Sequence, residues 1–183
     1  NYEPPRIRAI YNFEPVISEQ KGMTRVSLFI YVPATSITFV RDGDQYTGEY
    51  TFRAGIYERK RQITGDTGIH KVSVEEYRRT KSPGNEYLDS LFFEVEPDEY
   101  DIHISVTDRN GSREMPLLLD RVRVPSMSEG WALGNPVFLD SLGRPMSSVD
   151  TGDSVRIRTA YMAEKGRKFV ITHFFEDGDF SIS

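Results

Sequence analysis

Histidine is the side chain that titrates nearest to neutral pH, so the three histidines of this chain are the first candidates for acid–base or metal chemistry. His70, His103 and His173 stand far apart, and none has the His-x-His or His-x3-His spacing that brings two imidazoles to one metal ion. His103 falls on the polar side of an alternating segment, where we expect a solvated or cross-strand histidine. The histidines therefore predict no metal site and no catalytic base.

Two acidic loops place carboxylates close together, as calcium sites do, because this hard cation takes about six to eight oxygen ligands. They are Asp42-Gly43-Asp44 and Glu176-Asp177-Gly178-Asp179. Neither has the spaced Asp-x-Asp-x-Asp-Gly pattern with a distal Glu, and Asp-Gly is a common turn pair. We interpret both loops as turns and expect no bound cation and no cofactor.

The sequence contains no motif of nucleophilic or phosphate chemistry: it has no Gly-x-Ser-x-Gly elbow, no Gly-rich phosphate loop and no cysteine. The carboxylate pair of a glycosidase cannot be singled out, since 28 acidic residues make such pairs easy to nominate. Asn110-Gly111-Ser112 matches a glycosylation acceptor, but Asn-Gly also suits a type I′ hairpin turn, which we expect instead. We predict no enzyme, with no catalytic, cofactor-binding or metal-binding residue.

Aromatic side chains are the remaining candidates for a binding surface. Phe29, Tyr31, Tyr46 and Tyr50 could form a face that stacks sugars or binds protein, because large aromatic surface is costly to leave in water. Cross-strand aromatic pairing inside a sandwich accounts for most of them, and we favour it. For Trp131, the only tryptophan, we expect burial at a junction between modules rather than an exposed ligand platform.

The segments that carry these residues alternate with a period of two, which is typical of β-strands. Val26, Leu28, Ile30 and Val32 share one face of residues 24–33, and the other face is also apolar, so this strand should be covered on both sides. Further strands are predicted at residues 36–41, 45–57, 69–79, 87–95, 100–107 and 117–124, with turns between them at 42–44, 81–85, 97–99 and 108–111.

Seven or eight short strands without a convincing helix predict an all-β fold, an antiparallel immunoglobulin- or fibronectin-like sandwich over residues 1–125, with a closed barrel as the alternative. Residues 125–135 shift toward Ser, Gly and Met, and we place a linker there. Residues 126–183 then form a second β module with strands at 137–139, 154–160 and 168–175 and turns at 143–145 and 164–166. These strands are too few to close a sandwich, so we expect a partial module.

Composition excludes several classes of partner. A net charge of -5 and the interspersed basic residues argue against nucleic acid, and the longest basic run, Glu58 to Arg61, fits the solvated end of a hairpin. No stretch approaches the roughly 18 apolar residues of a membrane span. The start Asn1-Tyr2-Glu3, without an initiator methionine, leads us to expect a processed or trimmed chain.

Residues 76–139 carry a pattern that resembles a known family. An aromatic residue is followed by Arg78-Arg79-Thr80, and a Pro turn is preceded by Leu91-Phe92-Phe93-Glu94-Val95. A Tyr-led strand then ends in Val106-Thr107-Asp108-Arg109, and a Ser-rich segment follows Val122-Arg123-Val124-Pro125. This order resembles the β-rich region of bacterial GWxTD-domain proteins. Gly130-Trp131 is followed by Ala132-Leu133-Gly134, so the signature Thr-Asp is missing. The resemblance implies an extracytoplasmic location, in the periplasm or cell envelope.

We therefore expect a non-catalytic exported bacterial β-sandwich protein that serves as a structural or protein-interaction module of the cell envelope. A protein partner, or a second copy, would bind along an unpaired strand edge or on an aromatic patch. One alternative is a carbohydrate-binding module, which needs exposed aromatic rings on one face. Another is an accessory domain of an extracytoplasmic hydrolase, which needs converging carboxylates in a pocket.

Overall fold

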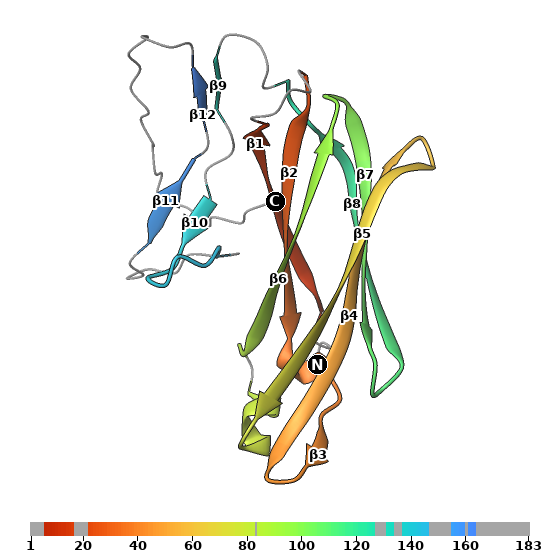
Figure 1. Ribbon diagram of the computed structural model, residues 1–183, viewed down its shortest axis with the longest axis vertical. Coiled ribbons are helices and arrows are strands. Elements are labelled where there is room, and N and C mark those ends of the chain that lie inside the picture. Colours follow the sequence, from red (N-terminus) through yellow and green to blue (C-terminus); the bar gives the residue numbers. More distant parts are fainter. Residues whose placement is uncertain are drawn as a thin grey trace, which may run out of the picture. The chain divides into compact units, whose positions relative to one another are not determined.

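The computed structural model describes residues 6–16, 22–82, 84–126, 131–133, 137–146, 155–159 and 161–163. These residues form antiparallel strands and two short 3-10 helices (Figure 1). The strands are β1 Arg8–Pro15, β2 Thr24–Pro33, β3 Val40–Asp42, β4 Gln45–Glu58, β5 Arg61–Val74, β6 Glu86–Val95, β7 Glu99–Asp108, β8 Arg113–Arg123, β9 Trp131–Leu133, β10 Val137–Leu139, β11 Arg156–Arg158 and β12 Tyr161–Ala163; the helices are η1 Ala34–Ser36 and η2 Tyr77–Lys81.

The chain divides into two compact units made of interleaved segments. The first unit comprises Asn1–Ala9, Leu28–Phe93 and Asp98–Arg123, and the second comprises Ile10–Ser27, Glu94–Pro97 and Val124–Ser183. The predicted modules 1–125 and 126–183 stay a prediction. In the described residues, no helix is both long enough and apolar enough to cross a bilayer.

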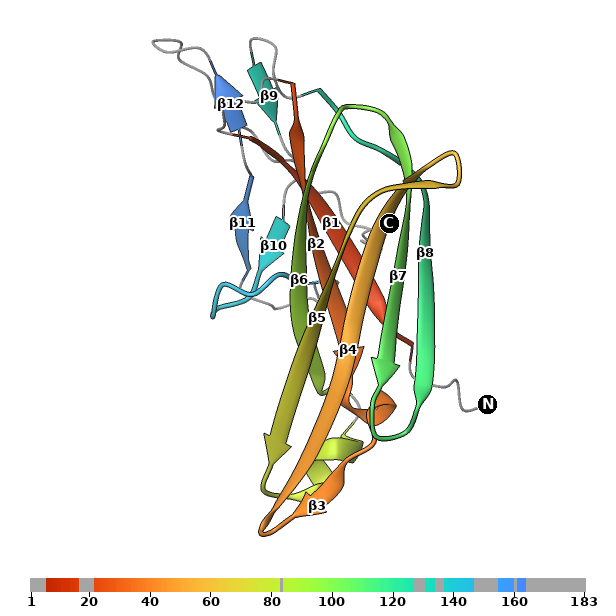
Figure 2. The ribbon, with the colours of Figure 1, turned by 45° about the vertical axis from the view of Figure 1, so that its right-hand side comes forward.

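The described residues are mostly antiparallel β-sheet, so the prediction of an all-β sandwich is confirmed; its immunoglobulin-like identity stays a prediction. One sheet has the order β3-β4-β7-β8 with β5 paired to β4, and Figure 2 shows β5, β4, β7 and β8 side by side. The other sheet has the order β1-β2-β6. Side chains of β4 and β7 alternate between the core and the outer face, as the pattern of residues 100–107 predicts.

The core is built from apolar residues that face each other across the register of the larger sheet. Phe52 lies opposite Val106, Ala54 opposite Ile104, and Ile56 opposite Ile102. From the other sheet, β2 contributes residues that are buried on both of its faces, as predicted: Val26, Ser27, Leu28, Phe29, Ile30, Tyr31 and Val32. Burial of such side chains contributes about 1.5–3 kcal/mol each, so this contact area accounts for most of the stability of the sandwich.

The long β4–β5 hairpin turns at Arg59-Lys60. Glu58 pairs with Arg61, so the loop has two residues, and both have positive φ, 46° for Arg59 and 74° for Lys60. This is the geometry of a type I′ turn, which matches the right-handed twist of the two strands. The prediction that Glu58 to Arg61 is the solvated end of a hairpin is confirmed.

The prediction of a type I′ turn at Asn110-Gly111 is wrong. Pairing of β7 with β8 ends at Asp108 and Arg113, so the loop has four residues, and only Ser112 among them has positive φ. The Asp108 carboxylate accepts hydrogen bonds from the backbone N–H of Asn110 (3.2 Å) and of Thr38 (3.0 Å). A buried aspartate that caps its own turn favours the wider loop.

Two predicted strands have other bounds than expected, because a 3-10 turn replaces part of each. The strand expected at 36–41 is a turn with Ile37 N–H bonded to Ala34 C=O (3.1 Å), and β3 begins only at Val40. The strand expected at 69–79 belongs to β5, which begins earlier, at Arg61, and ends at Val74, where η2 soon follows. In η2, Thr80 is buried and its hydroxyl donates to Tyr77 C=O (2.8 Å), a local bond that competes with strand pairing.

The second unit contains two short antiparallel ribbons, β10–β11 and β9–β12. Val137 and Leu139 are buried, and Thr24 Oγ1 donates to Pro125 C=O (2.7 Å). The predicted strands at 137–139 and 154–160 are confirmed, the latter only over Arg156–Arg158, whereas the predicted linker 125–135 was wrong where Trp131–Leu133 forms β9. The predictions for residues 164–166, 168–175 and 176–179, for His173, and for the Trp131 side chain lie outside the described residues.

Candidate functional site

A buried polar cluster joins the two sheets of the first unit. Tyr50 of β4 and His70 of β5 are direct cross-strand partners with stacked rings, their centroids 5.1 Å apart. Tyr50 Oη donates to Asp89 Oδ2 of β6 at 2.5 Å, and His70 Nδ1 lies 2.8 Å from Asp89 Oδ1 and 3.0 Å from Tyr50 Oη. Tyr87 stands beside these rings, its centroid 5.7 Å from that of His70.

The hydrogen-bond pattern fixes where the protons sit. The single hydroxyl hydrogen of Tyr50 is used in the short bond to Asp89. Since the Asp89 carboxylate only accepts, His70 Nδ1 must carry a hydrogen, which it shares between Asp89 and Tyr50. The carboxylate thus accepts from two side chains of the opposite sheet, and this polar pair of bonds clamps β6 to the β4–β5 hairpin.

The surroundings of Tyr50 keep its hydroxyl protonated. Burial of the ring raises the pKa of Tyr50, and the hydrogen bond to Asp89 raises it further. Burial also raises the pKa of Tyr87. Tyr50 is therefore a permanent donor rather than a base or nucleophile, and the cluster is suited to holding sheets together rather than to chemistry.

A second feature is an open hollow on the outer face of the larger sheet, with a volume of about 840 Å³. Its floor is the cross-strand pair Gly55 and Gly65, and His103 is the partner of Gly55 on the other side. The rings of Tyr57 and His103 lie with centroids 4.3 Å apart. Polar side chains from β4, β5, β7 and β8 surround the floor: Arg53, Gln62, Asp66, Thr67, Ser105 and Glu114.

The sandwich buries Phe29, Tyr31 and Tyr50, so the alternative of an exposed aromatic face is wrong for three of its four members. Tyr46 is half-buried and packs against Tyr77 of η2, with centroids 5.1 Å apart. Cross-strand pairing of aromatic rings, the favoured interpretation, is seen for Tyr50, which stacks on His70. No sequence pattern indicates Tyr57, because the glycine that accommodates its ring lies two residues away and the second glycine lies on the neighbouring strand.

Two of the histidines and the first acidic loop lie at different places in the larger sheet. His103 is exposed on the polar face of β7, as predicted, while His70 belongs to the clamp. Asp42 and Asp44 are exposed at the β3–β4 turn, where Gly43 has φ of 60°. Within the part of the chain that the structure describes, no group of three or more His, Asp or Glu side chains is placed to hold a metal ion.

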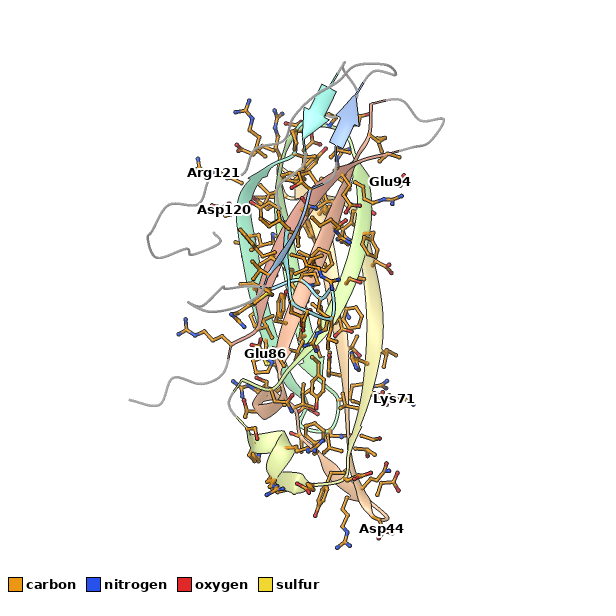
Figure 3. All side chains as sticks on the ribbon, turned by 90° about the vertical axis from the view of Figure 1, so that its left-hand side faces the viewer. Asp44, Lys71, Glu86, Glu94, Asp120 and Arg121 are labelled. Carbon is orange, nitrogen blue, oxygen red and sulfur yellow. The ribbon has the colours of Figure 1, made fainter. Side chains whose placement is uncertain are left out.

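The two edges of the larger sheet differ. In β8, Pro116 lacks an amide hydrogen, and a bulge at Asp120 and Arg121 interrupts the pairing opposite Asp101 (Figure 3). Arg121 has φ of 50°, and its N–H bonds to Asp101, which lowers the pKa of that carboxyl. In β5 the register is continuous from Thr64 to Val74, and among the described residues this strand pairs only with β4.

No protein-family model and no curated protein matches this sequence. The clamp, the hollow and the two sheet edges are therefore the observations on which a function can be built. Of these, the edges and the hollow face outward, whereas in the clamp Tyr50 is buried and His70 and Asp89 are half-buried.

Proposed function

We propose that this chain is a non-catalytic β-sandwich module of the bacterial cell envelope that binds a protein partner by accepting an extended segment along the free edge of β5. The observation that carries the proposal is the contrast between the edges: β8 is blunted by a proline and a bulge, and β5 is not. Strand addition at an open edge is a common way for a β-sandwich to bind an extended peptide.

The edge of β5 has the length and residue types that strand addition needs. The regular stretch Thr64–Val74 covers about 35 Å at about 3.3 Å per residue, and it contains no proline. Ile69 is 57 % exposed, which offers an apolar contact to a partner side chain, and the exposed Lys71 projects from the same strand (Figure 3). Unpaired backbone groups would supply affinity and these side chains would supply specificity.

The envelope location rests on the resemblance of residues 76–139 to the β-rich region of GWxTD-domain proteins. We expect the native protein, followed with an antibody in the bacterium that produces it, to fractionate with the periplasm or membranes. Recovery in the cytosolic fraction, with a cytosolic marker enzyme as reference, would contradict this part of the proposal.

Site-specific photo-crosslinking tests the binding edge in the native cell. A photoreactive amino acid at Ser73 on β5 is compared with the same amino acid at Asp120 on β8, both exposed positions outside the lining of the hollow. We expect a discrete crosslinked protein from Ser73 only, and we expect Ile69→Lys to abolish it. Leu142→Lys, at a side chain that is 75 % exposed in the second unit, is the matched control. Equal crosslinking from both strands would refute edge binding.

A further inference from the structure

The outer face of the larger sheet carries a second, independent site. We propose that the hollow over Gly55 and Gly65 binds a carbohydrate chain, with one pyranose ring stacked on the Tyr57 ring. This site uses the face of the sheet and not its edge, so it does not depend on strand addition at β5. All of its residues belong to the first unit.

The glycines are what allow Tyr57 to lie against the sheet. A Cβ atom on Gly55 would stand 2.9 Å from Cε2 of Tyr57, closer than van der Waals contact allows. Likewise, the side chain of Gln62 covers Gly65 and occupies the space that a Cβ there would need. Tyr57 Oη donates to Gln62 Oε1 at 3.1 Å, which fixes the ring in this position.

Paired glycines in adjacent strands are costly, since each destabilises a strand by about 0.5–1 kcal/mol relative to alanine. Glycine inside a strand often marks a place where a ligand approaches the backbone closely. Here the two glycines let the side chains of Tyr57 and Gln62 lie close to the backbone, and the ring of Tyr57 stands beside that of His103. Aromatic rings of this kind stack against the apolar face of a sugar ring.

The rim of the hollow supplies hydrogen-bonding groups that are available to a ligand. Within the described residues, the Arg53 and Glu114 side chains make no hydrogen bond or ion pair; Arg53 lies on β4 opposite Ser105, and Glu114 lies on β8 opposite Thr107. A guanidinium donates at five N–H positions and a carboxylate accepts at two oxygens. Neighbouring hydroxyl groups of a sugar both donate and accept, so they match such a set.

A polypeptide is a poorer match for this hollow. The floor lies on β4 and β5, and β4 is paired with β5 on one side and with β7 on the other, so the backbone groups of Gly55 are already engaged in the sheet. Over β4 a peptide main chain would find no unpaired backbone, and recognition there must come from side chains alone. The volume of about 840 Å³ falls in the usual range for small-molecule sites, about 300–1,000 Å³.

The experiment is isothermal titration of the full chain with cellohexaose, xylohexaose, maltohexaose and chitohexaose. We expect at least one of them to bind, Tyr57→Ala to weaken that binding by at least about tenfold, and Tyr57→Phe to keep it within about threefold, because a stacked ring is worth about 1 kcal/mol or more. Tyr77→Ala, at an exposed tyrosine of η2 away from the hollow, is the matched control and should bind as the wild type does.

Circular dichroism and a melting curve establish that each variant is folded. If Tyr57→Ala does not fold, Arg53→Ala, at an exposed position on the rim, takes its place and should also weaken binding by about fivefold or more through the lost hydrogen bonds. No binding to any of the four oligosaccharides at millimolar concentration would overturn the proposal, and so would unchanged affinity in both variants. Crosslinking at Ser73, which does not line the hollow, should persist in Tyr57→Ala and separates this site from the β5 edge.

Discussion

Replacing Tyr50 by phenylalanine removes one oxygen atom from the polar clamp and leaves the packing of the ring in place. The wild-type Tyr50 is fully buried, and its hydroxyl makes the 2.5 Å bond to Asp89. In the variant, Asp89 keeps only the bond from His70 Nδ1, at 2.8 Å, to hold β6 to the β4–β5 hairpin. The variant therefore isolates the contribution of one hydrogen bond between the sheets.

The expected loss follows from the type of bond. Hydrogen bonds to charged groups contribute about 1.5–3 kcal/mol, and here the acceptor remains buried after its donor is removed. For a chain of 183 residues, each kcal/mol lowers the melting temperature by about 2–4 °C, so Tyr50→Phe should lower it by about 3–12 °C. Packing of the ring against Phe52 and His70 should be unaffected, since their centroids lie 6.4 and 5.1 Å away.

Urea denaturation followed by circular dichroism measures this loss. Tyr77→Phe is the matched control, because its ring is 47 % exposed and removal of its hydroxyl should change stability by less than about 0.5 kcal/mol. If Tyr50→Phe were as stable as Tyr77→Phe, the Tyr50–Asp89 bond would contribute nothing and the clamp would have to be abandoned.

Three further predictions concern pH and backbone geometry. The fold raises the pKa of Tyr50 above its ordinary 10.0, so as the pH rises the unfolded chain releases this proton before the folded chain does. Above about pH 10 the free energy of unfolding of the wild type should therefore fall more steeply than that of Tyr50→Phe, by up to about 1.4 kcal/mol per pH unit. Urea denaturation of both proteins at several pH values measures the difference. Gly68→Ala should lower the free energy of unfolding by about 1–3 kcal/mol in a melting experiment, since a Cβ at this position would overlap the ring of Phe52. The matched control Thr67→Ala should lower it much less. Replacing Arg59-Lys60 by Asn-Gly should raise stability by about 1 kcal/mol, because both positions have left-handed backbones; a lower melting temperature would contradict the type I′ assignment.

Alternation of apolar and polar residues predicts strands well where one face of the strand is buried and the other is exposed to solvent. In β7, Ile102 and Ile104 are buried and His103 between them is exposed, as expected. The same rule predicts the two-sided burial of β2, where Phe29 and Tyr31 occupy the second face. These strands depend on period alone, so the sequence contains the information needed to find them.

The turns follow rules that are only partly local. Arg59-Lys60 has no residue that favours positive φ, and the pairing of two 14-residue strands imposes the I′ geometry on it. Asn110-Gly111 has ideal residues for that turn, but bonds from Thr38 and Asn110 to Asp108 impose a wider one. Tertiary contacts decide both cases, and the residues of the turn do not reveal them.

The clamp and the hollow depend on contacts between residues that are distant in sequence. His70 and Asp89 are 19 positions apart, and Tyr50 and Asp89 are 39 apart, so no motif of fixed spacing could join them. The hollow needs the register that sets Gly55 opposite Gly65 and beside His103. Register follows from the hairpin and its twist, which alternation alone leaves undetermined.

The proline at position 116 and the bulge next to it in β8 have a consequence for assembly. A sheet whose two edge strands can both pair with another molecule can add copies of the protein without limit and grow into a fibre. Here the proline and the bulge disfavour extension on the β8 side, so in the described part of this sheet β5 is the longest regular edge, and two copies that met along it would form a closed pair rather than a growing chain of copies.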